Sequence, residues 1–332
     1  MTTPRILACA VATLVALTAC TASSDEKVVG PATAGGVAGV GQGSGGRASS
    51  PSTGSPATSP AVVTLTPEEY RTELEKARGP VRAAVKKLAA TGGLKTLDKR
   101  LKQTSTAVDG AVTRLAELAP PAEVKVQHDD YVEALRALSV AFGGVRQDAE
   151  AQRLCTGPAV LTGMDRAGEL SNVEKAADAL SGYPASVISV KAPKQRTRRL
   201  SNGRFIASEG RPSRAYLELR NRNSKDAVVV LVRGKRKAIT VYVRRKSNFK
   251  IQGVRDGNYK IYYTFGDDWD AKARSFTRLC RFEKFGKSVR FRTVRTGTQT
   301  RWTTRWTNWK ITLHTVRGNV RPKQVKPGDF PT

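Results

Sequence analysis

"DAVVVLVRGKRKAITVYVRRK", residues 226–246, is the stretch that decides how the carboxyl-terminal half of this 332-residue chain folds. It contains two short runs rich in valine, with isoleucine and tyrosine, and these residue types favour β-strands. Each run is followed by a cluster of basic residues, at positions 233–237 and 244–246. Strands commonly end where polar residues gather, so the clusters are predicted at strand ends or in an adjacent loop.

The same pattern returns in five further segments after Pro184. They read RAYLELRNR, SNFKIQG, GNYKIYYTF, SVRFRTVR and WKITLHTVR, and turn-forming Asn, Asp and Gly separate them. Seven or more short strands of this kind predict an all-β sandwich over residues 186–332. Successive side chains of a strand point to opposite faces. Val289, Phe291 and Thr293 are therefore expected on the apolar face, and Arg290 and Arg292 on the other.

Almost all of the net positive charge belongs to this β-region. Residues 191–332 contain 37 Lys and Arg against 9 Asp and Glu, whereas residues 61–190 contain 17 of each kind. Such an excess repels itself, which favours an anionic partner. The alternative is a solvated strand face whose charges only guard against edge-to-edge aggregation. The residues predicted to bind polyanions are Arg220, Arg222, Arg233, Arg236, Arg244, Arg245, Lys246, Arg290, Arg292, Arg301 and Arg305.

Residues 301–309 read RWTTRWTNW and interleave arginines with three of the four tryptophans of the chain. One hypothesis is that Trp302 and Trp306 stack on sugars or bases while the arginines pair with phosphates. The other is that the indoles are core or edge residues of the last strands. A threonine-rich alternation suits a strand, and a large β-core needs aromatic residues.

An acidic cluster, Asp267, Asp268 and Asp270, stands in the middle of this basic region. It is predicted to form a turn that fixes the neighbouring tryptophan and pairs with Lys272 or Arg274. A carbohydrate-active enzyme would have to draw its acids from this cluster. The cluster is tight for a glycosidase and lacks an isolated acid in an apolar setting.

The chain has two histidines, His128 and His314. His128 is predicted to be a surface or capping residue, because no second histidine or cysteine lies at metal-ligand spacing. The GxSxG, P-loop and HExxH motifs are absent. The sequence therefore predicts a protein without catalytic machinery, metal or cofactor.

Residues 64–185 are predicted to form an antiparallel helical bundle. Thr66, Pro67 and Glu69 have the spacing of a capping box, which marks a helix start, and a kink is expected at residues 79–80. Two more helices follow before residue 150, and shorter ones after residue 157. The apolar positions at helical spacing in the first helix are Tyr70, Leu74, Ala77, Val81, Ala84 and Leu88.

The amino terminus combines one arginine, an apolar run at residues 6–19 and the sequence LTAC, which ends at Cys20. This resembles the lipobox of bacterial lipoproteins. The resemblance implies a signal peptide over residues 1–19 and a diacylglycerol on Cys20. It also implies a protein held on the extracytoplasmic face of the cell membrane. Residues 20–63, rich in Gly, Ser, Thr and Pro, are predicted to be a disordered linker.

The segment NFKIQGVRDGNYKIYY, residues 248–263, resembles a hairpin of prealbumin-like and carboxypeptidase-regulatory-like sandwiches. More broadly, residues 210–330 resemble an uncharacterised β-domain of secreted actinobacterial proteins. These resemblances imply a fold and no known activity.

Two cysteines remain after the lipidated one, Cys155 in the helical region and Cys280 in the β-region. Outside the cytoplasm such a pair is expected to form a disulfide, which would join the two domains. The predicted protein is thus a lipid-anchored helical bundle and β-sandwich. Its basic domain would bind anionic wall polymer, anionic lipid or extracellular nucleic acid. The alternatives are a cell-wall or carbohydrate-active enzyme, and an envelope scaffold acting through the bundle.

Replacing Cys20 with Ala should release the protein from the membrane, because the lipid anchor would be lost. Fractionation of cells that express the wild type and Cys20→Ala measures this. Unchanged membrane retention of the variant, or a wild-type mass without acyl groups, would contradict the lipoprotein prediction.

Overall fold

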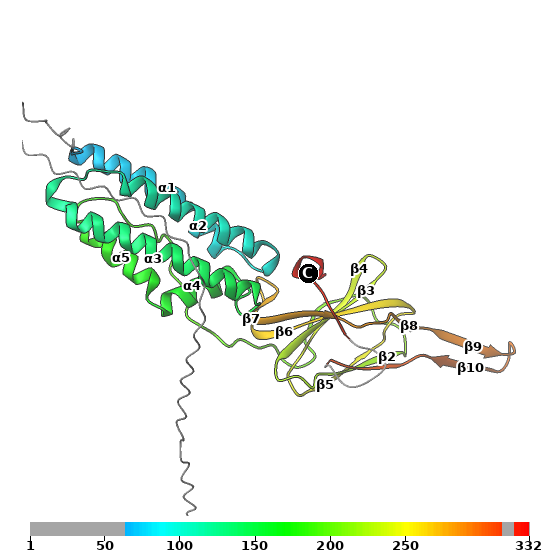
Figure 1. The fold of residues 1–332 in the computed structure, drawn as a ribbon. Coiled ribbons are helices and arrows are strands. Elements are labelled where there is room, and N and C mark those ends of the chain that lie inside the picture. The colour runs from blue at the N-terminus through cyan, green and yellow to red at the C-terminus, as the bar shows by residue number, and fades with distance from the viewer. Residues whose placement is uncertain (1–63, 314–321, 332) are drawn as a thin grey trace, which may run out of the picture. The chain divides into compact units, whose positions relative to one another are not determined.

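Helices precede strands in the computed structural model, which describes residues 64–313 and 322–331. The predicted signal peptide, Cys20 and the predicted linker at residues 20–63 lie outside the described residues, as does His314. The helices are α1 (Pro67–Ala89), α2 (Leu94–Ala116), the short 3-10 helix η1 (Ala122–Val124), α3 (Lys125–Glu150), α4 (Gly157–Arg166) and α5 (Glu169–Ala179) (Figure 1).

The predicted capping box starts helix α1. The Thr66 hydroxyl accepts a hydrogen bond from the Glu69 N–H at 3.3 Å, and the Glu69 carboxylate accepts one from the Thr66 N–H at 2.9 Å. Both bonds satisfy N–H groups that have no partner within the helix. The expected kink does not end the helix, because α1 continues past Pro80 to residue 89.

The apolar stripes of the helices share one hydrophobic core. In α1 the stripe is as predicted except that Val85 is buried and Ala84 is only partly buried. Val187 is also buried in this core, and Ile188 and Val190 pack against it. The helical core therefore extends beyond residue 185, the predicted domain boundary. None of the helices among the described residues has the length and apolar character needed to span a bilayer.

His128 is buried, so its prediction as a surface residue is wrong, whereas the capping alternative agrees with its contact to a carbonyl in the last turn of α2. Its Nδ1 lies 2.9 Å from the Tyr70 hydroxyl, and its Nε2 lies 3.0 Å from the carbonyl oxygen of Leu115. Burial disfavours the imidazolium and lowers the pKa of His128. Both ring nitrogens have partners within the helical core, which explains how a polar ring is accommodated there.

The strands form a seven-stranded, a three-stranded and a two-stranded sheet among the described residues. The first has the order β1-β4-β3-β6-β7-β12, with β8 paired to β6, and is antiparallel; the second has the order β11-β2-β5, with β11 parallel to β2; β9 and β10 form the third. Their bounds are β1 (Phe205–Ser208), β2 (Tyr216–Arg220), β3 (Asp226–Arg233), β4 (Arg236–Val243), β5 (Asn248–Gln252), β6 (Gly257–Asp270), β7 (Ser275–Lys284), β8 (Val289–Phe291), β9 (Thr293–Gly297), β10 (Trp302–Trp306), β11 (Trp309–Thr312) and β12 (Lys323–Gln324), and a 3-10 helix, η2 (Pro327–Asp329), follows.

The quoted stretch forms the β3–β4 hairpin, with β3 between β4 and β6. The two basic clusters lie where the sequence predicted them, at the turn between β3 and β4 and after the end of β4. The prediction of an amino-terminal helical region followed by a β-region is confirmed at this level.

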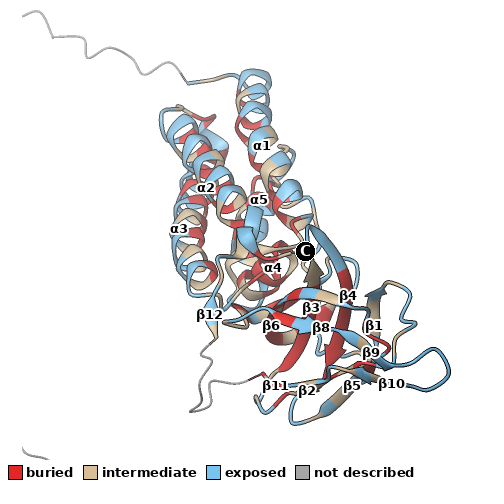
Figure 2. Ribbon diagram, turned by 90° about the vertical axis from the view of Figure 1, so that its right-hand side faces the viewer, coloured by how far each residue is buried: buried red, intermediate tan, exposed pale blue. Residues whose placement is uncertain are grey.

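Strand β3 is apolar on both faces and packs into two different cores. Val229 and Leu231 pack in one core together with Leu217 and Ile251 of the three-stranded sheet. Val228 and its alternate neighbours pack in the other core, with aromatic residues and the two cysteines. The buried segments of these strands stand out from the exposed β9 and β10 in Figure 2.

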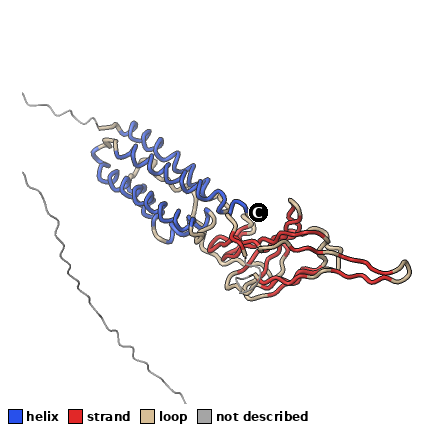
Figure 3. Tube along the Cα trace, turned by 45° about the vertical axis from the view of Figure 1, so that its right-hand side comes forward, coloured by secondary structure: helices blue, strands red, loops and turns tan. Residues whose placement is uncertain are grey.

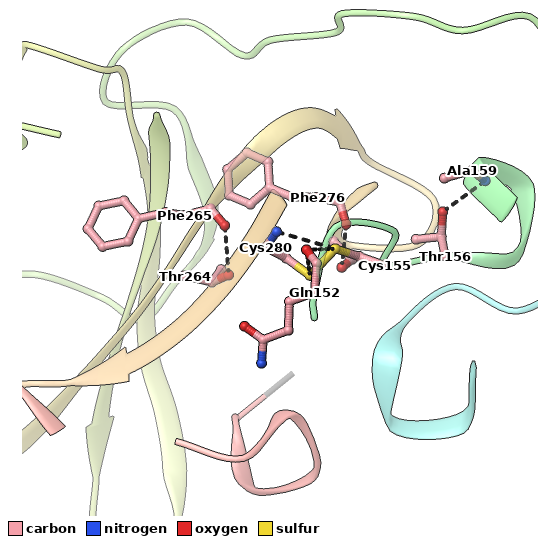
Figure 4. The surroundings of a disulfide bond; sticks show 9 residues. Gln152, Cys155, Thr156, Ala159, Thr264, Phe265, Phe276 and Cys280 are labelled. Atoms are coloured by element: carbon pink, nitrogen blue, oxygen red, sulfur yellow. Dashed lines mark hydrogen bonds between the residues drawn. A yellow bond between two sulfur atoms is a disulfide. The ribbon is translucent and has the colours of Figure 1, made fainter. Parts of the chain in front are cut away.

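The predicted disulfide between Cys155 and Cys280 is present. The turn before α4 lies along strand β7, where the Cys155 N–H donates to the Thr277 carbonyl at 2.9 Å. In the same way the Cys280 N–H donates to the carbonyl of Gln152 at 3.1 Å. Figure 4 shows the cysteines in this setting. Backbone hydrogen bonds and a covalent bond therefore connect the helical and the β-region.

Replacing both Cys155 and Cys280 with Ala should lower the free energy of unfolding by about 2–5 kcal/mol, because the bridge closes a long loop in the unfolded chain. The sequence separation of the two cysteines is 125 residues. Urea unfolding of wild type and double variant measures the difference. Peptide mapping without reduction is the control, and two freely alkylatable thiols in the native protein would contradict the bridge.

Candidate polyanion-binding surface

Four of the predicted polyanion-binding residues have internal partners. Arg220 pairs with Glu218 at 2.7 Å, and Arg233 pairs with Glu209 at 2.8 Å. The Arg244 guanidinium and the Lys246 ammonium donate to backbone carbonyls, each at 2.8 Å. Arg220 is half-buried. Its partner Glu218 lies two residues earlier, and therefore on the same face of β2.

The other seven are exposed and form no ion pair with any described residue. Arg236 lies at the β3–β4 turn, and Arg222 and Arg245 follow the ends of β2 and β4. The remaining four belong to β8, to the β9–β10 hairpin or to residues beside them: Arg290, Arg292, Arg301 and Arg305. The structure thus separates the predicted set into strand-end positions and one cluster around the hairpin.

The β9–β10 hairpin extends beyond the other strands, as Figure 3 shows. Its register pairs Trp306 with Thr293, Thr304 with Arg295 and Trp302 with Gly297. Because directly paired residues and alternate positions share a face, one face of the hairpin carries both tryptophans and Arg295. Arg305 belongs to the opposite face.

The face with the tryptophans forms one wall of a groove of roughly 570 Å³. The loops around residues 212–214 and 255–256 form the other wall. The lining residues contributed by these loops include Arg214, Arg255 and Asp256. Sequence reasoning did not select Arg214 or Arg295, because only the hairpin register and the loop position bring them beside the indoles.

Each of the two hypotheses for the tryptophans, a stacking residue or a core residue, fits a different tryptophan. Trp302 is 51% exposed, whereas Trp306 is half-buried and packs against the β-core. Trp309 is also half-buried and donates its indole N–H to the carbonyl of Arg290 at 2.9 Å. Trp302 is thus an exposed groove residue, and Trp306 connects the groove to the core.

Thr293 does not share the buried face of Val289 and Phe291, so this part of the alternation is wrong. The chain leaves β8 after Phe291 and begins β9 at Thr293. Thr293 is exposed and donates two hydrogen bonds to Asp256, from its N–H at 2.7 Å and from its hydroxyl at 3.0 Å. These bonds fix the base of the hairpin to the loop across the groove.

The acidic cluster binds the segment that links the helical and β-regions. Asp268 accepts hydrogen bonds from the backbone and the guanidinium of Arg198, each at 2.8 Å, and Asp270 accepts one from Arg198 at 3.0 Å. Asp267 pairs with Lys225 at 2.5 Å. The three acids lie in strand β6, but Asp270 also fixes the turn that follows, because it accepts hydrogen bonds from the N–H groups of Lys272 and Ala273 at 2.9 and 3.0 Å. Arg198 and Lys225 take the place of the predicted Lys272 and Arg274 side chains.

The local backbone explains why the acidic cluster reaches Arg198 in the segment between the helical and β-regions. The pairing of β6 with β7 is interrupted by a bulge between Phe265 and Asp267. Asp268 follows with a φ of 57°, a left-handed conformation that is uncommon for residues other than glycine. Next to it Trp269 is buried and packs with Tyr242 and Phe276.

A second buried carboxylate, Asp226, binds the neighbouring linker arginine. It accepts two hydrogen bonds from Arg199, both at 2.6 Å, and a further one from the Tyr242 hydroxyl. Burial alone would raise the pKa of Asp226, but these donors outweigh it and lower the pKa below its usual value. Arg198 and Arg199, which lie between the helical and β-regions, thus each form an ion pair with carboxylates of β-strands.

Comparisons with known proteins add no further assignment. No protein-family model, no curated protein and no solved structure matches this chain. Among the residues that the structure describes, no cluster of three or more histidine, cysteine or acidic residues is arranged to hold a metal ion.

Replacing Asp268 with Asn should lower the free energy of unfolding by about 1–3 kcal/mol, because Arg198 and the Thr277 hydroxyl lose a charged acceptor. Hydrogen bonds from these donors outweigh burial and hold the pKa of Asp268 below 3.8. The stabilisation is therefore present above pH 3.8 and is lost as the pH falls through the lowered pKa. Urea unfolding at pH 7 and pH 3 measures both effects.

Asp267→Asn is the matched control, since its carboxylate is 35% exposed and has Lys225 as its partner. It should cost less than about 1 kcal/mol. Equal losses for the two variants, or a loss at Asp268 that does not shrink in acid, would contradict this role.

Proposed function

We propose that this protein is a lipid-anchored, extracytoplasmic binding protein without catalytic activity. In this proposal Cys20 holds it to the cell membrane, and residues 20–63 act as a flexible spacer. The helices form an antiparallel bundle and the strands a β-sandwich. The basic β-region binds anionic polymers of the cell envelope or the anionic membrane surface.

One observation carries the proposal. Seven of the predicted arginines are exposed, and their guanidinium groups form no ion pair with a described acidic residue. The carboxylates of the same region are engaged elsewhere, as with Asp226, Asp268 and Asp270. An exposed excess of one charge sign attracts polyanions and concentrates them at the surface. The uncompensated arginines therefore support binding more than a merely solvated surface.

The described contacts do not favour the enzyme alternative. Asp268 and Asp270 share Arg198 as a hydrogen-bond donor, and their pKa values lie below the usual value of 3.8 despite burial. A general acid needs a carboxyl group that keeps its proton near neutral pH, which requires the opposite shift.

The scaffold alternative also lacks support in the described residues. A partner surface on the helices would require a contiguous exposed apolar patch. The exposed large apolar side chains of the described helices are Val126 and Val140, which lie several turns apart on α3.

Replacing Arg290 and Arg292 together with Gln should weaken polyanion binding several-fold and reduce its salt dependence, while the fold remains intact. For a DNA duplex, log K falls by about 0.9 per phosphate contact for each unit of log salt, so losing two contacts lowers the slope by about 2. Titrations at several salt concentrations measure both quantities. The probes are a DNA duplex, poly(glycerol phosphate) and phosphatidylglycerol vesicles.

The matched control is the double variant Lys86→Gln, Lys87→Gln, which removes the same charge from the exposed end of α1. It should leave affinity and slope nearly unchanged. The proposal fails if wild type binds none of the three probes at low salt.

A further inference from the structure

Two arginines of the groove are stacked on its two tryptophans. The guanidinium carbon of Arg295 lies 4.3 Å from the centre of the Trp302 ring. The guanidinium carbon of Arg214 lies 5.6 Å from the centre of the Trp306 ring. These are cation–π distances, and such pairs hold a long and flexible side chain in one orientation.

The stacking leaves the N–H donors of both guanidiniums without an internal acceptor. The indole rings are the partners of these two guanidiniums, and neither guanidinium pairs with a carboxylate or carbonyl of a described residue. A planar guanidinium can bind a phosphate with two parallel hydrogen bonds along its edge. Each pair of arginine and indole is therefore a pre-oriented phosphate site.

The charges around the groove favour an anion. Arg214, Arg255 and Arg295 line it together with one carboxylate, Asp256. Asp256 already accepts two hydrogen bonds from Thr293. The guanidiniums thus outnumber the carboxylate, and the remaining lone pairs of the carboxylate can accept hydrogen bonds from ligand hydroxyl groups.

The geometry of the groove indicates a linear ligand. Trp302 and Trp306 are four residues apart on β10, which corresponds to about 14 Å along a strand. The hairpin and the loops wall the groove on two sides, so a chain can lie between them, whereas a bilayer presents its phosphates in a plane. Two phosphate sites along one groove therefore fit an extended polymer.

The occupied indole faces decide between the linear polymers. Binding of single-stranded nucleic acid relies on aromatic faces that accept stacked bases. Here Arg295 covers a face of Trp302, and Trp306 is half-buried beneath Arg214. These indoles therefore orient arginines, and the faces that the arginines cover are not open to stacked bases.

We infer that the groove between the β9–β10 hairpin and residues 212–214 and 255–256 binds a linear phosphodiester polymer of polyol or sugar units. Arg295 and Arg214 each bind one phosphate, and Trp302 and Trp306 hold them in position. This inference rests on the proposed function and narrows its ligand from polyanions in general to one chemical class and one site.

The test measures the dissociation constant of short poly(glycerol phosphate) for the full chain in a non-ionic detergent. Arg295→Gln and Arg214→Gln should each raise it about tenfold, the loss expected for a charged hydrogen-bonded partner. Arg274→Gln is the matched control, because it removes the same charge from the exposed turn between β6 and β7, outside the predicted binding residues. It should raise the dissociation constant less than about threefold.

Two further variants separate orientation from charge. Arg295→Lys keeps the charge but loses the planar fork, and Trp302→Ala keeps every charge but removes the ring beneath Arg295. Both should weaken binding several-fold with an unchanged salt slope. Thermal unfolding of each variant checks the fold, and Arg295→Lys replaces Arg295→Gln if the latter does not fold.

Several results would overturn the inference. One is that Arg274→Gln weakens binding as much as Arg295→Gln, which would leave diffuse charge as the cause. Another is that oligo-dT or phosphatidylglycerol vesicles bind more tightly than poly(glycerol phosphate) and depend on Arg295, which would assign the groove to nucleic acid or membrane. In these cases the proposed function stands. Absence of wild-type binding to every probe at low salt would instead refute the proposed function itself.

Discussion

The burial of strand β3 on both faces is the constraint on which the β-region depends. A strand with apolar residues on both sides has to be covered on both sides, since exposed apolar surface is unfavourable. One face is covered by the three-stranded sheet and the other by aromatic residues, the cysteines and the end of the chain near Phe330. The central strands therefore have little room for charge, and most of the arginines occupy turns, strand ends and the β9–β10 hairpin.

The carboxylates of the β-region are mostly occupied by partners within that region. Of its nine acidic residues, eight accept hydrogen bonds or form ion pairs with described residues of the same region. They connect Arg198 and Arg199 to strands β6 and β3, or they fix turns and the base of the β9–β10 hairpin. With so few acids and nearly all of them engaged, the excess of arginine and lysine remains at the surface. The positive charge of the surface thus follows from where the acids lie as well as from how many basic residues there are.

Features that depend on short stretches were predictable from the sequence, whereas those that depend on register or distant contacts were not. The capping box at Thr66, the strands beside the 233–237 cluster and the cysteine pair follow from local pattern or compartment. His128, in contrast, is buried by partners from other helices. In the candidate site, Trp302 was recognised from its sequence neighbours, but Arg295, which stacks on it, belongs to the opposite strand of the hairpin. Arg214 comes from a loop far away in the sequence, so nothing in the spacing of residues 301–309 indicates either partner.

Surface charge and stability oppose each other in this chain. A net excess of positive charge repels itself and destabilises the folded state. The disulfide and the ion pairs of Arg198 and Arg199 stabilise the fold against this repulsion where the helical and β-regions meet. The carboxylates of these ion pairs, Asp268 and Asp226, are buried, so salt screens the pairs less than it screens exposed charges. Added salt should therefore relieve the repulsion between exposed arginines more than it weakens these pairs. The same screening would weaken the proposed binding of a polyanion, because that binding depends on the exposed charges. In the proposed function, a bound polyanion would resolve this opposition, because it would neutralise the exposed arginines without disturbing the buried pairs. Binding would then stabilise the fold by mass action.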